Sequence, residues 1–325
     1  MSQTIEIIMY HYVRELPNTR YPNIKGLLLS HFREQLHFLL ESGRTFVSSD
    51  QILETIHGGK SLPKGSVLLT FDDGYLDHYT NVFPILDSMG IPAFFSMPGK
   101  IIREKSLLDV NRIHFILASQ PVEKLLPMTY ALLDYYRGKE FEIPSNKELY
   151  NKLAVANRFD PEEIIFLKRL LQVELPEKLR NLMAGKLFSQ CVGIPEPQFV
   201  DELYMSLEQV KVMCRYGMSW GIHGYDHYWM NRLSQPELEK DLAMALDVFD
   251  GIVPQNGWWC CYPYGSCSKA VIQCANRFGA SGGFTTEVRV ADLEKDSIFE
   301  LPRLDTIDYP PRSNNYLKYQ EGEQS

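Results

Sequence analysis

Five short apolar runs, each stopping at a polar or proline-containing stretch, constrain the fold of this chain more than any other feature. The runs cover residues 5–10, 67–71, 93–97, 218–222 and 258–262, and weaker candidates follow at 283–286 and 299–304. Helical stretches lie between them. Short apolar runs that alternate with helices are typical of β/α units that build a mostly parallel sheet. The sequence therefore predicts an α/β fold.

Helix boundary signals separate several of these runs. Ser206 and Gln209 form a capping-box pattern, and Gly217 lies where that helix is expected to end. A second capping box begins at Ser234, with a proline in the first turn, where proline is tolerated. Ser268 can cap a further helix. These signals support the alternation of strands and helices in the second half of the chain.

Residues 101–200 have a different character. They are rich in Leu, Glu and Lys, show little strand pattern, and contain an Asp-Pro-Glu-Glu helix start at 160–163. We interpret them as an all-helical insertion in a β/α domain made of residues 1–100 and 201–310. A chain of 325 residues is long enough for one large domain with such an insertion. The polar end, residues 311–325, is expected to be a flexible tail.

Charge and composition argue against several classes of protein. The formal net charge is −8, whereas nucleic-acid-binding proteins more often carry a basic balance or stripe. There is no run of about eighteen apolar residues that would predict a transmembrane helix. Residues 1–9 lack the features of a secretory signal, so a cytoplasmic location is expected. The six cysteines include no Cys-x-x-Cys pair, which favours reduced thiols over a zinc cluster.

Candidate chemical groups lie where three of the apolar runs stop. Asp72 and Asp73 follow one run, His223 and His227 follow another, and His11 follows the first. Because active sites of α/β folds gather at the carboxyl ends of parallel strands, we expect these side chains to meet. One carboxylate with two imidazoles is a common hydrolytic metal set, and a neighbouring carboxylate can accept a proton from water. Taken singly, each motif can also be an ordinary turn or a surface pair.

Two segments resemble signatures of the polysaccharide deacetylase family, also called the NodB-homology or carbohydrate esterase family 4 domain. They are Thr70-Phe-Asp-Asp-Gly74 and His223-Gly-Tyr-Asp-His227. The resemblance covers roughly residues 5–100 and 203–308 and implies a distorted (β/α)7-8 barrel. It implies Asp72 as the catalytic base, and Asp73, His223 and His227 as metal ligands. Gly224 replaces the usual Ser or Thr, whose hydroxyl braces the loop in the family.

Other family motifs are altered in this chain. Cys261-Tyr-Pro-Tyr-Gly265 lacks the arginine that commonly precedes Pro-Tyr, and Arg303 is the candidate substitute that orients the base. By resemblance, the backbone N–H of Tyr264 helps to hold the oxyanion. The usual C-terminal Leu-x-His motif is absent. Met9-Tyr-His11 matches a branch in which an N-terminal histidine supplies the acid, so His11 takes that role by resemblance.

The resemblance implies a metal-dependent hydrolase that removes an N-acetyl group from an amino sugar in a glycan, a nucleotide-linked sugar or a lipid-linked sugar. Zinc is the expected ion, with cobalt, nickel, iron and manganese as alternatives. Two alternatives remain on the same fold: a deformylase or other non-sugar amide hydrolase, and an inactive carbohydrate-binding homologue. The N-acetylated sugar is the expected partner, and the oligomeric state stays open.

Three further expectations concern the surroundings of the site. The helical insertion is expected to form a wall or lid suited to a small substrate, or only to add core or a dimer surface. It could also mediate assembly with a glycosyltransferase or a membrane lipid enzyme, which an exposed Leu-rich helical face would indicate. The remaining histidines are expected to lie on helices or loops and to need no role; they are His31, His37, His57, His78 and His114.

Overall fold

The computed structural model describes residues 3–17 and 19–320 of the chain. The described residues divide into two compact units. The first, the barrel unit, contains residues 3–14, 26–106 and 200–320. The second, the helical unit, contains residues 15–17, 19–25 and 107–199. Each unit has its own buried core.

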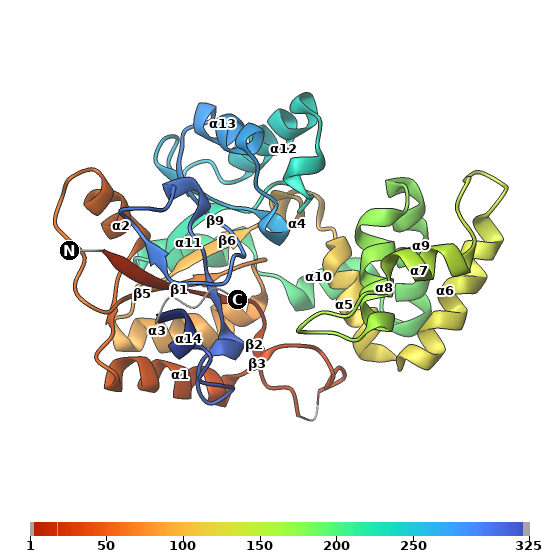
Figure 1. Ribbon diagram of the computed structural model, residues 1–325, viewed down its shortest axis with the longest axis horizontal. Coiled ribbons are helices and arrows are strands. Elements are labelled where there is room, and N and C mark those ends of the chain that lie inside the picture. Colours follow the sequence, from red (N-terminus) through yellow and green to blue (C-terminus); the bar gives the residue numbers. More distant parts are fainter. Residues whose placement is uncertain (1–2, 18, 321–325) are drawn as a thin grey trace. The chain divides into compact units, whose positions relative to one another are not determined.

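The barrel unit is built on one curled sheet (Figure 1). Its strands lie in the spatial order β10-β1-β5-β6-β7-β8-β9, with β4 beside β5 and β11 beside β1. Every pairing in it is parallel except that of β10 with β1. The strands are β1 Thr4–Tyr10, β4 Thr45–Phe46, β5 Ser66–Phe71, β6 Phe94–Met97, β7 Ser219–Ile222, β8 Trp258–Cys261, β9 Ala280–Phe284, β10 Ala291–Asp292 and β11 Leu304–Asp305; a separate small pair joins β2 Val13–Arg14 and β3 Leu27–Leu28. The predicted α/β class is confirmed.

The segment 301–305 nearly closes this sheet into a barrel. Leu301 pairs with Phe284 of β9 at one edge, and Leu304 pairs with Ile8 of β1 at the other. The sequence predicted a strand over 299–304, but only Leu304–Asp305 is a strand, and 298–300 form a 3₁₀ turn. A proline at 302 removes a backbone donor from the middle of this run, and its two ends pair with different strands.

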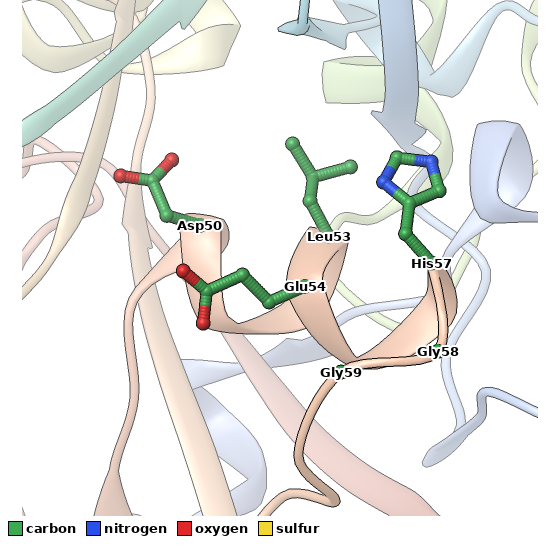
Figure 2. Close-up of a pocket in the computed structure, with 6 residues that line it drawn as sticks. All are labelled: Asp50, Leu53, Glu54, His57, Gly58 and Gly59. Carbon is green, nitrogen blue, oxygen red and sulfur yellow. The ribbon is translucent and has the colours of Figure 1, made fainter.

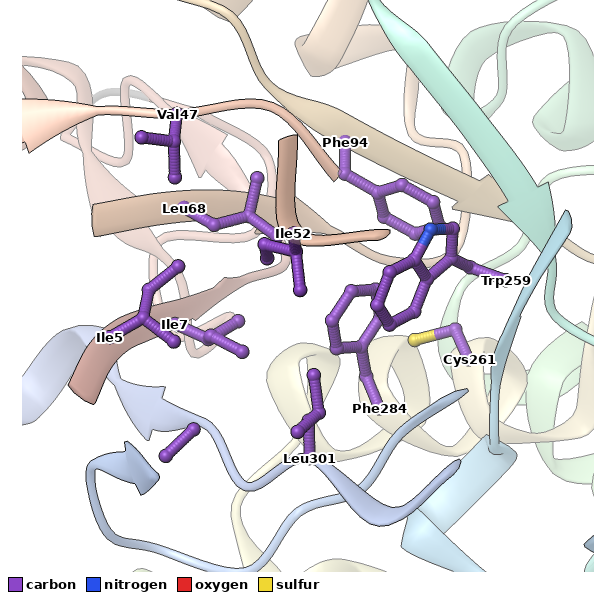
Figure 3. Packing of buried hydrophobic residues seen from close by; sticks show 11 residues of the cluster. Ile5, Ile7, Val47, Ile52, Leu68, Phe94, Trp259, Cys261, Phe284 and Leu301 are labelled. Atoms are coloured by element: carbon purple, nitrogen blue, oxygen red, sulfur yellow. The ribbon is translucent and has the colours of Figure 1, made fainter. Parts of the chain in front are cut away.

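Apolar side chains of the curled sheet and its neighbours pack into one buried layer (Figure 3). Alternation along β5 sends Leu68, Thr70 and Asp72 to the same face, so the apolar layer gives way to a polar one toward the carboxyl ends. Trp259 and Phe284 stack in the layer with ring centroids 4.7 Å apart. The layer consists of Ile5, Ile7, Val47, Ile52, Leu68, Phe94, Trp259, Cys261, Phe284, Ala291 and Leu301.

Helices connect and cover the strands of the barrel unit. The Ser206 capping box is present, because the Gln209 backbone N–H bonds the serine oxygen while the Gln209 side chain accepts the Ser206 N–H. The helices are α1 Leu29–Glu41, α2 Ser49–Ile56, α3 Phe83–Met89, α4 Gly99–Glu104, α11 Leu207–Arg215, α12 Gln235–Val248, α13 Lys269–Arg277 and α14 Tyr316–Gln320, with a π-helical turn at His78–Val82.

The helical unit is an all-helical bundle with its own core (Figure 1, yellow to green). Helix α9 packs against α5 and α6 and buries Leu179, Met183 and Leu187. Its helices are α5 Asp109–Ser119, α6 Val122–Tyr136, α7 Asn146–Leu153, α8 Glu162–Arg169 and α9 Glu177–Cys191, and α10 Glu196–Leu203 runs from this unit into the other. Its large exposed apolar residues are Tyr135, Val155, Phe159 and Leu182, so the described part of the unit has no exposed Leu-rich face.

Residues 15–25 were assigned with the β/α domain from the sequence, but 15–17 and 19–25 lie with the helical unit. The ring of Tyr21 packs edge-on against Phe115 and Phe199, with centroids 5.0 and 5.9 Å apart. The Lys25 ammonium pairs with Asp160. Contacts between residues so distant in sequence leave no local pattern, which is why this boundary was not predicted.

The predicted flexible tail also differs from the structure over residues 311–320. Helix α14 lies there, Tyr316 stacks on Tyr309 at 5.2 Å, and the Gln320 amide donates to Glu6 at 2.7 Å. These contacts order a segment whose polarity had suggested a tail; residues 321–325 lie outside the described residues. Among the helices in the described part of the chain, none is both long and apolar enough to cross a membrane.

Candidate metal and catalytic site

The Asp72-Asp73 turn follows β5 at the carboxyl end of the sheet. The backbone N–H of Asp72 donates to Tyr10 O and so extends the pairing with β1 by one residue. At Asp73 the chain leaves the sheet with φ of 73°, and Gly74 continues with φ of 68°. Aspartate tolerates this left-handed region better than most residues. The turn buries both carboxylates, which are 1% and 3% exposed.

The loop after β7 carries both histidines and is braced by Asp241 of α12. The Asp241 carboxylate accepts the backbone N–H groups of Tyr225 at 2.9 Å and Asp226 at 3.1 Å. Gly224 has φ of 70°, and a Cβ there would lie 3.0 Å from Asp241 Oδ2. A serine or threonine at 224 would therefore be strained. In this chain the brace comes from α12 and not from position 224.

Asp73, His223 and His227 form a buried group whose ligand atoms all lie within 4.8 Å of one another. Asp73 Oδ1 lies 3.3 Å from Nε2 of each histidine. The His223 Nδ1 donates to Cys261 O at 2.6 Å, which leaves Nε2 as the atom that faces Asp73. The Tyr75 hydroxyl donates to Asp73 Oδ2 at 2.6 Å. Two imidazole nitrogens that face one carboxylate oxygen suit a divalent cation.

The donor set also fits a cation chemically. Asp73 Oδ1 is buried and makes no hydrogen bond of good geometry, although both Nε2 atoms face it. A buried anionic oxygen in that position requires a positive partner. Burial lowers the pKa of His227, which favours the neutral imidazole that binds metals. Three protein ligands from two loops leave positions for water and substrate.

Asp72 points into a ring of donors beside this group. Arg303 Nη1 lies 2.8 Å from Asp72 Oδ2, while Ser96 Oγ and Cys261 Sγ each donate to Oδ1 at 3.0 Å. Arg303 is itself 1% exposed and is fixed by Thr285 O and Thr70 Oγ1. Burial opposes ionisation of Asp72, but Arg303, with His223 and His11, outweighs it and holds its pKa below the usual range.

His11 lies close enough for its charge to favour the ionised forms of both Asp72 and Asp73. Its backbone oxygen accepts the Nε2–H of His78 at 2.8 Å. Burial lowers the pKa of His78 to about 4, so this ring is neutral near pH 7. His78, expected to need no role, thus supports the segment that carries His11. The π-helical turn that begins at His78 is a feature often found near functional sites.

Tyr264 lies in the 3₁₀ turn Pro263–Gly265, which begins one residue beyond the end of β8, and it has φ of 58°. Its ring stacks on Trp229 at 4.7 Å and 7°, and meets His227 edge-on at 4.7 Å. Among the described residues, the non-glycine positions with positive φ are Asp73, Lys105, His227 and Tyr264. Three of these four are residues that the sequence singled out. Such strain persists where surrounding contacts enforce it, and it clusters at functional sites.

Other candidate sites are weaker. All six cysteines are free, and in the described part of the chain the Asp73 group is the convergent set of metal-ligating side chains. A hollow of about 570 Å³ on α2 is lined by Asp50, Leu53, Glu54, His57, Gly58 and Gly59 (Figure 2). Its two carboxylates and its imidazole lie along an open helix face and do not converge. This hollow is therefore no second metal centre.

Comparison with known proteins points to one family. The model of the polysaccharide deacetylase family matches residues 59–122 and 194–283, on either side of most of the helical unit. A poly-beta-1,6-N-acetyl-D-glucosamine N-deacetylase of Escherichia coli is 43% identical over 93 residues, which is 28% of this chain and 13% of that enzyme. A putative polysaccharide deacetylase of Bacillus subtilis, YxkH, is 19% identical over 90% of this chain and 67% of that protein.

Solved structures share the fold over almost the whole chain. The Streptococcus pyogenes deacetylase PplD, in complex with acetate, has a TM-score of 0.61 at 17% identity and covers 98% of this chain and 97% of its own. IcaB from Ammonifex degensii has a TM-score of 0.56 at 19% identity, over 97% and 95% of the two chains. The chain belongs to the polysaccharide deacetylase family, and the predicted barrel-type fold is confirmed.

Proposed function

We propose that this protein is a metal-dependent hydrolase that removes the N-acetyl group from an amino sugar. The observation that carries the proposal is the buried Asp73, His223 and His227 group with the ionised Asp72 beside it. Family membership supports the same reaction. The match to the Escherichia coli enzyme spans only 13% of that protein, so its name suggests a class of substrate and no particular one.

Asp73, His223 and His227 would hold the cation, with zinc as our first choice and cobalt, nickel, iron or manganese as alternatives. When bound, such an ion supplies Lewis-acid polarisation of the acetyl carbonyl and of a water molecule. The hydrogen bonds that the ligand side chains make with their neighbours favour this use. His223 is oriented by Cys261 O and Asp73 by the Tyr75 hydroxyl, and partners of this kind fix the ligand atoms in place.

Asp72 acts as the base in this proposal. Its carboxylate accepts the proton of the water whose oxygen attacks the acetyl carbon. Arg303, Ser96 and Cys261 hold the carboxylate in one orientation, and the lowered pKa keeps it ionised. The role of Arg303 in this proposal is to position the base, as the missing family arginine would.

His11 and Tyr264 complete the proposed chemistry. As the carbon–nitrogen bond breaks, the His11 imidazolium gives a proton to the leaving nitrogen, so that acetate and a free amine result. The Tyr264 backbone N–H donates to the oxyanion of the tetrahedral intermediate, and its strained turn aims the donor. Assignment to the branch with an N-terminal Met-Tyr-His motif is part of this proposal.

We propose a small carrier-linked amino sugar in the cytoplasm as the substrate. A set of N-acetylated substrates tests this together with the reaction. The zinc-loaded protein is incubated with nucleotide-linked and lipid-linked sugars, chito-oligosaccharides and β-1,6-linked N-acetylglucosamine oligomers. Mass spectrometry then follows loss of one acetyl group, and N-formyl analogues serve as competitors.

Removal of one acetyl group from a carrier-linked sugar, abolished by His227→Ala together with zinc binding, is the expected result. Full zinc occupancy in the His227→Ala variant would show that the ligand assignment is wrong. Faster turnover of long oligomers would show that the substrate is a polymer and not a carrier-linked sugar. Turnover of N-formyl analogues alone would make the protein a deformylase, and zinc binding without turnover of any substrate would favour a binding protein.

A further inference from the structure

The side chain of Tyr75 contacts the carboxylate of Asp73 on the side away from the histidines. Its hydroxyl donates to Oδ2 at 2.6 Å, whereas Oδ1 lies 3.3 Å from Nε2 of His223 and of His227. The two oxygens of one carboxylate therefore have separate partners. Tyr75 is 0% exposed, so water cannot replace its hydroxyl without a rearrangement of the core.

Two further tyrosines hold the ring of Tyr75 in a stacked column. The ring of Tyr12 stacks on the ring of Tyr75, with ring centroids 4.0 Å apart and an interplanar angle of 21°. The ring of Tyr204 is nearly parallel to that of Tyr75, with centroids 6.1 Å apart and an interplanar angle of 10°. Tyr12 and Tyr204 are 3% and 4% exposed. The guanidinium of Arg14 lies 4.7 Å from the Tyr12 ring centre and pairs with Asp77 at 2.6 Å. The column is thus fixed by side chains from separate parts of the chain.

The backbone supports the same arrangement. Tyr75 and Tyr204 form an isolated antiparallel bridge, and the Met205 N–H donates to Gly74 O at 3.0 Å. The segment that follows α10 is therefore hydrogen-bonded to the turn that presents Asp73. At that turn Asp73 has φ of 73°, so its side-chain direction depends on contacts that hold the backbone there.

We propose that Tyr75 is a positioning residue for the metal site, which holds the Asp73 carboxylate so that Oδ1 faces both histidines, and that Tyr12 and Tyr204 fix its ring. The inference rests on the proposed metal site and deepens it. Without the hydroxyl, Asp73 Oδ2 loses a charge-assisted hydrogen bond, and the carboxylate can rotate away from the histidines. Loss of such a partner typically weakens metal affinity about 10–100-fold.

The test compares Tyr75→Phe with wild type by zinc competition against a chromogenic chelator, using the full chain. The expected result is zinc binding weaker by about 10–100-fold. The matched control is Tyr10→Phe. Tyr10 is also 0% exposed, and its hydroxyl contacts the neutral side chain of Gln35 at 3.2 Å. This control should bind zinc as the wild type does.

Two more variants test the column. Tyr204→Phe keeps the ring and should keep the zinc affinity, whereas Tyr204→Ala should weaken it by less than Tyr75→Phe does. Equal zinc affinity in Tyr75→Phe and wild type overturns this inference alone. If Tyr10→Phe loses as much zinc affinity as Tyr75→Phe does, and the metal-free protein also melts at a lower temperature, the cause is a general defect of the core. That result also overturns this inference. Absence of zinc binding by the wild type overturns the metal site itself, and with it the proposed function.

Discussion

Each unit of this protein contains a buried carboxylate that is paired with basic side chains, and the two surroundings differ. Asp72 of the barrel unit is 1% exposed and faces Arg303, which is equally buried. Asp160 of the helical unit is 6% exposed and pairs with Lys168 at 2.7 Å and with Lys25, whose side chain is 63% exposed. In both, burial opposes ionisation and the basic partners outweigh it, so both pKa values lie below the usual range.

The backbone near the two carboxylates also differs. All four described non-glycine residues with positive φ belong to the barrel unit, and three of them surround the proposed site. The Asp160 pair instead links residues 19–25 to α8 through flexible lysine side chains. Buried donors hold the Asp72 carboxylate in one orientation. The Asp160 carboxylate instead connects a loop to a helix. We therefore expect the same chemical change to affect activity at one site and local stability at the other.

The largest effect is expected for Asp72→Asn. The variant keeps the volume of the side chain but removes the base, so kcat should fall by about 10²–10⁴-fold. Zinc affinity should be retained, because Asp72 is not one of the three converging ligands. The substitution also leaves Arg303 buried without its counter-charge, which should lower the free energy of unfolding by about 3–5 kcal/mol. Zinc competition, steady-state kinetics and thermal unfolding measure the three quantities.

Asp160→Asn is the matched comparison, since it makes the same isosteric change at a buried carboxylate in the other unit. It should leave kcat and zinc affinity unchanged. If Asp72→Asn lost its zinc while keeping its fold, the division of roles between Asp72 and Asp73 would be wrong. If Asp160→Asn lost activity to a similar degree, the expected contrast between the two carboxylates, one acting in catalysis and the other in local stability, would be wrong.

Five strands of the sheet could be predicted from the sequence, because β1, β5, β6, β7 and β8 are mostly buried runs that end at a polar or proline-containing stretch. The predicted run at 67–71 lies within β5, Ser66–Phe71, and the run at 218–222 contains β7, Ser219–Ile222. The proposed ligands follow from the same logic, since polar residues that end neighbouring parallel strands reach one edge of the sheet. The prediction of a strand over 299–304 was wrong. The proline in this run and the pairing of its two ends with different strands leave only a two-residue strand there.

The supporting contacts of the site could not be predicted. The Cys261 thiol contacts Asp72 across 189 residues of sequence, and Ser96 contacts it across 24. Neither spacing leaves a local pattern. Asp241, which braces the histidine loop, lies on an ordinary helix face. Tyr75 is the exception, because it directly follows the Asp-Asp-Gly turn and could have been singled out as a neighbour of the proposed ligand.

An intermediate effect is expected for Arg303→Lys. Lysine keeps the positive charge but cannot contact Asp72, Thr70 and Thr285 in the planar arrangement that Arg303 uses. A misplaced base can cost up to about 10²-fold, so we expect kcat to fall by about 10–100-fold with KM little changed. Arg277→Lys is the control, because Arg277 makes an exposed pair with Glu239 in the same unit. Unchanged kcat in Arg303→Lys would remove Arg303 from the positioning of the base.

The smallest effect is expected for the stability of the Asp160→Asn variant. At pH 7 the loss of two charge-assisted contacts should lower the free energy of local unfolding by about 1–3 kcal/mol. Hydrogen exchange of the α8 amides measures this, with wild type and variant compared at the same pH so that intrinsic exchange rates cancel. Asp134→Asn is the control, because Asp134 is 58% exposed and pairs with Arg137 on the surface of α6. Such exposed pairs contribute about 0–1 kcal/mol.

The pH dependence of this difference provides a sharper test. The folded-state pKa of Asp160 is lowered, so its contribution to stability is fully present above its unfolded pKa of about 3.9. The contribution is lost as the pH falls through the lower folded value, because the carboxylate then binds a proton in both states. The difference between wild type and Asp160→Asn should therefore be constant from pH 7 to about pH 5 and shrink below about pH 4. A difference that persists undiminished as the carboxylate is protonated would mean that Asp160 stabilises α8 by packing, and that its contrast with Asp72 does not arise from charge.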